Sequence, residues 1–312
     1  MKQNNQIRQV VFPLLAALIW GTAFVAQDVC ADVVEPMTFN AARSFIAVIV
    51  LLVIIWLFGL FRKDKPSFTA AEKKASRKTL VIGGLCCGVA LAVASNFQQA
   101  GIGAGTDAGK AGFITALYIV LVPLLGLFLR KKVSLPVWIA VIIAVAALYL
   151  LCIKGEFALQ TGDLLILLCA FFFAVHILII DHFTQTVDGM KLSCAQFLVA
   201  GILSAIGALI FEHPDWSAIF SVALPILYVG VFSSGVAYTL QILAQKGSNP
   251  TVVTILLSME SVFAVISGAI ILHQRMTTRE YVGCVLMLIA VILAQIPFPL
   301  KKDAGTAETV QK

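Results

Sequence analysis

Charged residues are scarce in this chain, and their scarcity excludes most classes of soluble protein. Asp, Glu, Lys and Arg make up 12% of its 312 residues, hydrophobic residues make up 60%, and the mean hydropathy is +0.99. A water-soluble fold could not bury so large an apolar fraction. The composition therefore predicts a protein that lies in a lipid bilayer.

Motifs for metals, nucleotides and hydrolysis are also missing. The seven cysteines have no CxxC pair and no zinc-like spacing, which favours buried free thiols. There is no HExxH, Walker or kinase signature, and the GxGxxA match at 103–108 lacks the strand that a dinucleotide fold needs. We therefore expect no enzyme activity, no catalytic residue, no metal and no cofactor. The net charge of +6 lies in short basic clusters without interleaved aromatics, so nucleic acid is not an expected partner.

Apolar runs of membrane-spanning length fill most of the chain. A helix of about 20 residues crosses the hydrocarbon core, and the first run continues past the length of a signal peptide, contains Trp20 and lacks a clear cleavage site. We expect ten spans, at Val10–Cys30, Thr38–Leu60, Leu80–Gly101, Ala111–Leu129, Leu135–Ile153, Asp163–Ile180, Leu192–Phe211, Val222–Ala244, Thr251–Leu272 and Tyr281–Leu300.

The positions of Lys and Arg predict the orientation. With a cytoplasmic N-terminus, seventeen of the 22 lie on the cytoplasmic side: two in residues 1–8, seven in 62–78, three in 130–132, one each at 191 and 246, and three in the tail. The positive-inside rule therefore places both termini in the cytoplasm. The expected location is the plasma (inner) membrane of a bacterium.

The two halves of the chain are similar in sequence. Shifts of 153, 147 and 143 residues align Ala17 with Ala170, Asp28 with Asp181, residues 88–90 with 235–237, and 113–118 with 256–261. This order indicates a duplicated five-helix unit, and because five is odd the second copy is inverted. We predict an all-α integral membrane fold of ten transmembrane helices as two inverted five-helix repeats, residues 1–155 and 156–300, with a cytoplasmic polar tail at 301–312.

Three stretches carry a resemblance to a known family: Ala17–Val25, Gly105–Leu125 and Val282–Ala294. With the two repeats, they resemble the drug/metabolite transporter superfamily, EamA type, over essentially the whole chain. The resemblance implies a carrier with helices one to four and six to nine around a central cavity. Helices five and ten would support it, and a homodimer through these two is left open. Ser261 stands where the family commonly has Pro, and His273-Gln274 replaces its Gly-Glu.

Two charged residues at membrane depth are the first candidates for a site. Glu260 lies near the middle of the ninth span, where a carboxylate must face water, find a partner or be protonated. We expect it to couple protons or to hold a substrate amine, and a hydrogen-bonded structural acid is the alternative. Arg43 in the second span could clamp a substrate carboxylate, snorkel outward, or pair with Glu35 or Asp32.

Two further charged or polar features have open interpretations. Lys110, with Asp107, begins the fourth span and is interpreted as an interfacial anchor or a local ion pair. On the ninth span, Thr254, Ser258 and Ser261 form a polar stripe about 120° from Glu260 on a helix of 100° per residue. Either the stripe or Glu260 faces the cavity.

Neutral polar and aromatic residues supply the remaining candidates. Polar faces run along the eighth span (Ser234, Tyr238, Gln241, Gln245) and the third (Asn96, Gln98, Gln99), and they could line a cavity or bond neighbouring helices. Trp20, Phe24 and Tyr118 suit cavity walls or ordinary packing, and His176 could titrate or bond a neighbour. The predicted substrate and coupling residues are Glu260, Arg43, His176, Trp20, Tyr118, Asn96, Gln99, Ser234, Tyr238 and Gln241.

The predicted function is a secondary transporter that works by alternating access. It would export a small amphipathic metabolite, such as an amino acid or a related amine, or drugs, with Glu260 exchanging a proton for substrate. Its expected partners are the small-molecule substrate, the lipid bilayer and protons. An uncoupled facilitator is the first alternative. An intramembrane protease, suggested by residues 233–235 with His176 or His273, and a non-transporting scaffold are remote ones.

Overall fold

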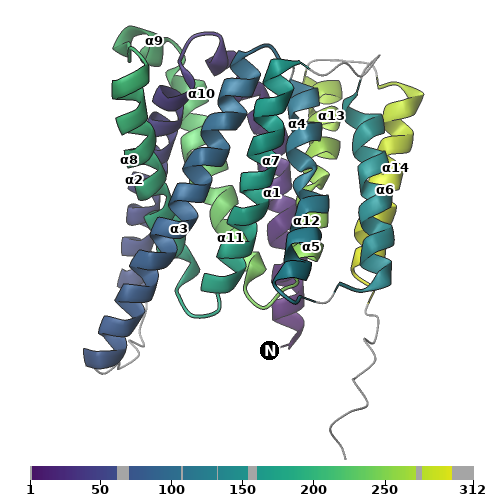
Figure 1. The fold of residues 1–312 in the computed structure, drawn as a ribbon, viewed down its shortest axis with the longest axis horizontal. Coiled ribbons are helices and arrows are strands. Elements are labelled where there is room, and N and C mark those ends of the chain that lie inside the picture. The colour runs from purple at the N-terminus through teal and green to yellow at the C-terminus, as the bar shows by residue number, and fades with distance from the viewer. Residues whose placement is uncertain are drawn as a thin grey trace, which may run out of the picture.

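The fold of the described residues is built from helices alone (Figure 1). The structure is a computed structural model that describes residues 2–61, 70–106, 108–131, 133–153, 160–271 and 276–296. Its elements are α1 (Lys2–Ala31), α2 (Pro36–Phe61), α3 (Ala70–Gly103), α4 (Ala108–Ala116), α5 (Tyr118–Phe128), α6 (Leu135–Cys152), α7 (Thr161–Phe183), α8 (Gly189–Phe211), α9 (Trp216–Ser221), α10 (Ala223–Tyr228), the π-helix η1 (Val229–Ala237), α11 (Tyr238–Gln245), α12 (Pro250–Leu257), α13 (Met259–Ile271) and α14 (Thr278–Ala294).

The lengths and hydropathy of these helices match a membrane protein. Within the described residues, eight stretches are long and apolar enough to span a bilayer, and Pro250–Ile266 is a shorter apolar helix. Together with α14 they account for the ten predicted spans. Large apolar side chains such as Ile142 and Leu209 are exposed on the outside, which is stable where lipid is the solvent. The predicted all-α membrane fold is confirmed.

Two predicted boundaries were wrong, and two spans carry an interruption. The fourth and ninth spans lie close to where they were predicted, but α4 and α5 meet at Leu117, and α12 and α13 meet at Ser258. The third helix begins at Ala70, ten residues early, because residues 70–79 are rich in good helix formers although too polar for the bilayer. The tenth ends at Ala294 and not at Leu300, since Pro297 disfavours helix in the residue before it.

Side-chain caps mark the start of several helices. Asp188 accepts from the backbone N–H groups of Met190 and Lys191 at the start of α8, and Asn249 accepts from that of Thr251 at the start of α12. Thr277 and Glu280 form a capping box on α14. These contacts satisfy N–H groups that have no partner within the helix and would be costly to bury.

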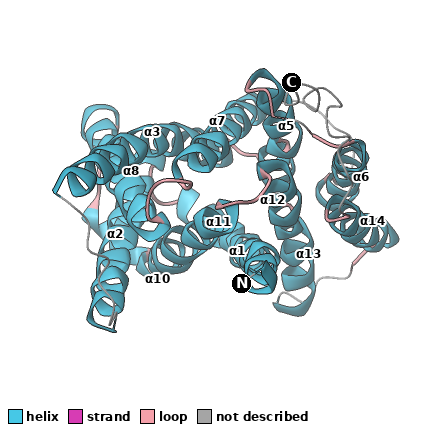
Figure 2. Ribbon diagram, turned by 90° about the horizontal axis from the view of Figure 1, so that it is seen from below, coloured by secondary structure: helices cyan, strands magenta, loops and turns pink. Residues whose placement is uncertain are grey.

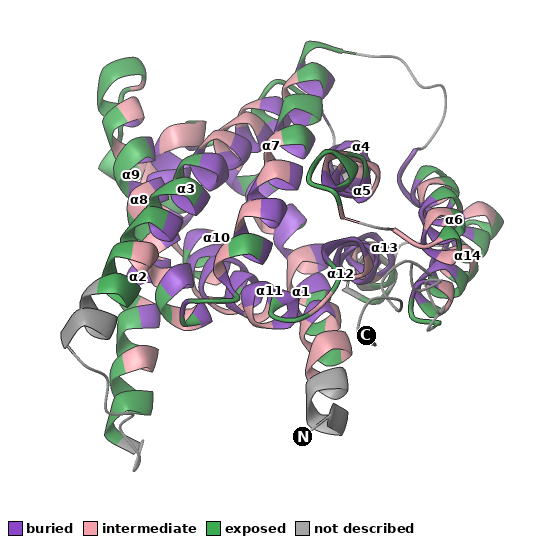
Figure 3. Cartoon of the chain, turned by 60° about the horizontal axis from the view of Figure 1, so that its bottom comes forward, coloured by how far each residue is buried: buried purple, intermediate pink, exposed green. Residues whose placement is uncertain are grey.

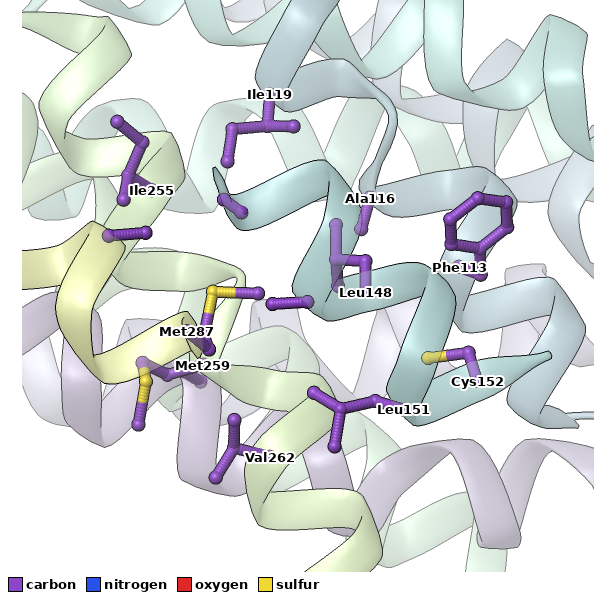
Figure 4. Close-up of a cluster of buried hydrophobic side chains, with 14 of the residues drawn as sticks. Phe113, Ala116, Ile119, Leu148, Leu151, Cys152, Ile255, Met259, Val262 and Met287 are labelled. Atoms are coloured by element: carbon purple, nitrogen blue, oxygen red, sulfur yellow. The ribbon is translucent and has the colours of Figure 1, made fainter. Parts of the chain in front are cut away.

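The largest apolar core joins the two halves of the chain. Figure 4 shows side chains of this cluster, among them Ile119 from α5, Leu148 from α6 and Met259 from α13. α6 and α14 pack against each other at one edge of the bundle (Figure 2). The outward faces of the helices are exposed and the inward faces are buried (Figure 3).

Two ion pairs join the α4–α5 segment to α7. Lys110 at the start of α4 pairs with Asp163 near the start of α7, and Lys131 after α5 pairs with Asp181 near the end of α7. The predicted local partner of Lys110, Asp107, lies outside the described residues. Both pairs cross between the two halves of the chain, so one ion pair links the halves at each end of α7.

Candidate functional site

A small cavity lies between the two halves, where the broken helices meet. Its volume is about 50 Å³. Its lining comes from six of the ten predicted residues and from eight others, which are Trp20, Phe24, Gln27, Arg43, Gln98, Thr115, Tyr118, Phe173, Ile177, Ser233, Tyr238, Gln241, Leu257 and Glu260. Among the spans that the resemblance places around the cavity, only the seventh, α8, contributes no lining residue in the described chain.

Glu260 faces this cavity from the first turn of α13. It is 4% exposed, and the Tyr118 hydroxyl donates to its Oε1 at 3.4 Å. Both residues begin the second half of an interrupted helix, so the two interruptions meet at one hydrogen bond. Thr254 and Ser258 of the polar stripe instead donate to carbonyls of their own helix, at 2.8 and 2.9 Å. The structure therefore places Glu260, and not the stripe, on the cavity.

Arg43 is a buried cation in the lining of the same cavity. Its Nη1 donates to Gln27 Oε1 at 3.3 Å, and the guanidinium carbon lies 5.4 Å from the centre of the Phe39 ring. In the described residues, no carboxylate lies within ion-pair distance of Arg43, and the Glu35 carboxylate accepts from His213 N. The predicted alternatives, snorkelling and pairing with Glu35 or Asp32, are not seen. A buried guanidinium without a counter-ion is costly, which favours an anionic ligand.

Aromatic rings form the apolar walls between these charges. The rings of Trp20 and Tyr238 meet edge to face, with centroids 4.8 Å apart, and Trp20 Nε1 donates to Ser233 O at 3.3 Å. Tyr238 also packs edge to face on Phe197 of α8, with centroids 5.3 Å apart. Such pairs fix large rings in place, so the cavity has a rigid apolar side.

The π-helix η1 changes which residues of the eighth span reach the cavity. The predicted polar face assumed α-helical spacing from Ser234 to Gln245, but a π-helix has a wider turn and shifts that register. Ser233 lines the cavity, whereas the Ser234 hydroxyl is buried away from it without a hydrogen-bond partner. Gln245 donates to Ile177 O at 3.0 Å. Tyr238 and Gln241 do line the cavity.

The other predicted residues lie behind the lining. His176 Nε2 shares a hydrogen bond of 2.9 Å with Gln196, and Gln99 Nε2 donates to Gln27 O at 3.0 Å. Asn96 accepts from Asn40 and donates to Ser204, both at 2.9 Å, and so links α2, α3 and α8. The contacts of these residues are hydrogen bonds to neighbouring helices, which was the alternative to lining a cavity.

The clearest lining residue that sequence reasoning missed is Gln27. It stands next to Asp28 near the end of the first apolar run, where polar residues are expected at the membrane surface. Gln99 could have indicated it. Gln99 lies one turn from Asn96 on the third span, and polar side chains buried between helices need polar partners on a neighbouring helix. Gln98 and Thr115, which hydrogen-bond at 3.1 Å, also line the cavity.

Gly21 allows α1 to approach the backbone at Glu260. A Cβ at this position would lie 2.5 Å from the carbonyl oxygen of Glu260 and 2.9 Å from the backbone nitrogen of Ala264. Backbone atoms cannot rotate away as a side chain can, so only glycine fits here. Gly21 therefore helps to set the position of Glu260.

Known proteins resemble this chain over nearly its whole length. The sequence profile of the EamA-like transporter family matches residues 8–153 and again 160–295. An uncharacterised transporter from Archaeoglobus fulgidus is 31% identical over 288 residues, which cover 90% of this chain and 84% of that protein. An uncharacterised transporter from Synechocystis sp. is 25% identical over 314 residues, which cover 94% and 91%.

A solved structure supports the fold independently. One crystal structure superposes with a TM-score of 0.74 at 17% identity, covering 92% of this chain and 96% of that one. At this identity the likeness concerns the fold alone. Each of the two matches to the family profile contains five of the ten spans, and an odd number of spans makes the second copy inverted.

Proposed function

The chain belongs to the EamA-like transporter family, and on this premise we propose that it carries a small amphipathic zwitterion, such as an amino acid, across the membrane by alternating access. It is a multi-pass membrane transporter and not an enzyme, and its surroundings are the lipid bilayer. The substrate class, the coupling to protons and the direction of export are the proposed parts.

The observation that carries the substrate class is a buried cation and a buried carboxylate in one cavity. Arg43 and Glu260 both line it, both are 4% exposed, and they form no ion pair with each other. A zwitterion would supply a carboxylate to the first and an ammonium to the second, so both costs of burial would be offset by one ligand. The rings of Trp20 and Tyr238 would contact its apolar part.

The size of the cavity supports alternating access. About 50 Å³ is well below the roughly 300 Å³ or more that a small-molecule site usually has. A metabolite could enter only if the helices moved apart. The interruptions at Leu117 and Ser258 supply points at which half-helices could move without breaking the rest of the bundle.

Proton coupling would arise from competition at Glu260. A proton and a substrate ammonium cannot both neutralise the same carboxylate, so each would exclude the other. Protons entering from outside would then displace the substrate outward during export. The alternative is a facilitator in which Glu260 holds only the substrate.

The orientation is also part of the proposal. Arg8 donates to Lys246 O at 3.4 Å and Gln9 to Gly247 O at 3.2 Å, so the N-terminal segment and the loop after α11 share one face of the bundle. We call this the N-terminal face. Because several basic residues lie on it, the positive-inside rule supports a cytoplasmic location for this face in a plasma membrane.

The purified protein in liposomes is expected to transport leucine faster than either of two analogues with one charge. Isoamylamine lacks the carboxylate and 4-methylpentanoate lacks the amine, so each would leave one buried charge without a counter-ion. We expect leucine flux to exceed both by about tenfold or more, the factor for one charge-assisted hydrogen bond. Radiolabelled uptake with and without a pH gradient measures this.

The result also separates the alternatives. Flux that ignores the pH gradient would identify a facilitator. Equal flux of the three solutes would contradict the zwitterion site, and the absence of any flux above that of protein-free liposomes would contradict this transport function.

Gly21→Ala is expected to slow leucine flux about tenfold, because the added methyl group forces α13 and Glu260 away from α1. Gly112→Ala is the matched control: in the described part of the chain its Cβ would meet only the Phe24 ring, at 3.9 Å, which is an ordinary contact. Initial rates at equal amounts of reconstituted protein provide the comparison. Equal rates for the two variants would show that the position of α13 is not important for transport.

A further inference from the structure

A second cavity opens at the N-terminal face, separate from the central one. Its volume is about 270 Å³, several times that of the central cavity. It is lined by Val122 and Gly126 of α5, by Lys131 and Asp181, and by residues 248–251 at the start of α12. This is close to the roughly 300 Å³ at which small-molecule sites begin, in the conformation that the structure shows.

One wall of this cavity is an ion pair. The ammonium group of Lys131 donates to Asp181 Oδ2. The Asp181 side chain is 9% exposed and that of Lys131 is 36% exposed, so the carboxylate is held inside while the cation remains within reach of solvent. The pair thus presents a positive and a negative group, side by side, to any solute in the cavity.

The second cavity and the central site lie along the same two helices. Tyr118 of the central site and Val122 and Gly126 of the second cavity are spaced by four residues on α5, and therefore share one helix face. On α12, Leu257 of the central site and Pro250 of the second cavity are seven residues apart and also share a face. Both cavities therefore lie along the contact between α5 and α12.

We propose that the second cavity is an entry site that binds the zwitterion before it reaches the central site. The substrate carboxylate binds the Lys131 ammonium, and the substrate ammonium binds the Asp181 carboxylate. Two new ion pairs replace the existing one, so no charge is left unpaired. This inference rests on the proposed zwitterion transport, and it adds a second location at which the protein binds both charges of the substrate.

A chemical label at the rim tests binding without transport. Ser248 lines the cavity and is partly exposed, so Ser248→Cys introduces a thiol there. The full-length variant, combined with Glu260→Gln to weaken central binding, is treated with a maleimide. Mass spectrometry of the peptide around position 248 then gives the alkylation rate of this thiol, whatever the native cysteines do. Leucine is expected to slow it, and isoamylamine and 4-methylpentanoate to slow it much less.

Lys131→Gln is expected to raise the leucine concentration for half-protection by about tenfold, as for loss of one charge-assisted bond. Lys191→Gln is the matched control, because Lys191 is an exposed lysine near the start of α8 and does not line the cavity. Gly126→Phe should fill the cavity and abolish protection by leucine, whereas Gly126→Ala should preserve it, since among the described residues a Cβ there meets only the Lys131 side chain, at 3.8 Å.

The outcomes distinguish the entry site from the transport function. If wild-type protein transports leucine but leucine does not protect position 248, or protects it equally in Lys131→Gln, the entry site is overturned and the transport function stands. If wild-type liposomes show no leucine flux, the transport function fails, and the entry site fails with it. Gly126→Ala, which keeps the cavity open, shows whether replacement of the glycine alone is enough to abolish protection.

Discussion

Glu260→Gln is expected to abolish leucine transport that is driven by a pH gradient, with a fall of about 100-fold. Glutamine has nearly the same shape, so the Tyr118 contact can persist, but the side chain can neither take up a proton nor pair with an ammonium group. The loss of a buried charge-assisted interaction accounts for a fall of this size. Uptake into inside-out liposomes with an imposed pH gradient measures it.

Two variants show which property of Glu260 matters. Glu260→Asp keeps the carboxylate and shortens the side chain, so we expect reduced but pH-driven flux. Tyr118→Phe removes only a hydrogen bond of 3.4 Å and should slow transport by a few-fold at most. Unchanged proton-driven flux in Glu260→Gln would contradict proton exchange at this residue. A fall in flux together with a persisting response to the gradient would leave Glu260 as a substrate ligand only.

Composition and repeated pattern were sufficient to predict the fold. Apolar runs of spanning length and their inverted duplication depend on local sequence, which a single chain displays in full. Arg43 and Glu260 were found for a related reason, because an ionisable residue within an apolar run stands out at any register. The repeat also aligned Leu117, where the fourth span is interrupted, with Glu260, which lies two residues after the interruption of the ninth span at Ser258.

The register of the eighth span could not be predicted in the same way. Projecting Ser234 to Gln245 onto one face assumes a constant number of residues per turn. Nothing in the sequence VGVFSSGVA indicates a π-helix. Gln27 was missed because a polar residue near the end of a run is usually in contact with the membrane surface. Both errors concern the direction in which a side chain points, which tertiary packing decides.

Ion pairs between distant segments could likewise not be predicted from the sequence pattern. Lys110 and Asp163 are 53 residues apart, and Lys131 and Asp181 are 50 apart. The sequence suggested a neighbour, Asp107, for Lys110, because local pairing is the simplest assumption. In the fold, α4 begins where α7 begins and α5 ends where α7 ends, so charges at the ends of these helices meet (Figure 1).

Asp163→Ala is expected to destabilise the protein by about 3–5 kcal/mol, the usual cost of breaking a buried ion pair by removing one partner. The Asp163 side chain is fully buried, and its carboxylate accepts from Lys110, from Thr106 at 3.0 Å and from Gln160 N at 2.7 Å. The substitution therefore removes the ion pair and the capping box of α7 together. A fall of about 5–8 °C in the thermal unfolding midpoint in detergent is expected for a protein of this size.

Asp215→Ala is the matched control for that loss. Asp215 also caps a helix, accepting from Ser217 N at 2.8 Å, but α9 is six residues long and exposed, so the change should cost about 1 kcal/mol or less. The unfolding midpoint of Asp163→Asn should lie between those of the two alanine variants, because the amide oxygen of asparagine still accepts a hydrogen bond while the charge is gone. Equal midpoints for Asp163→Ala and Asp215→Ala would mean that the bilayer-spanning helices alone hold the halves together. A graded series would show instead that the inverted repeats are joined at this end by one buried carboxylate.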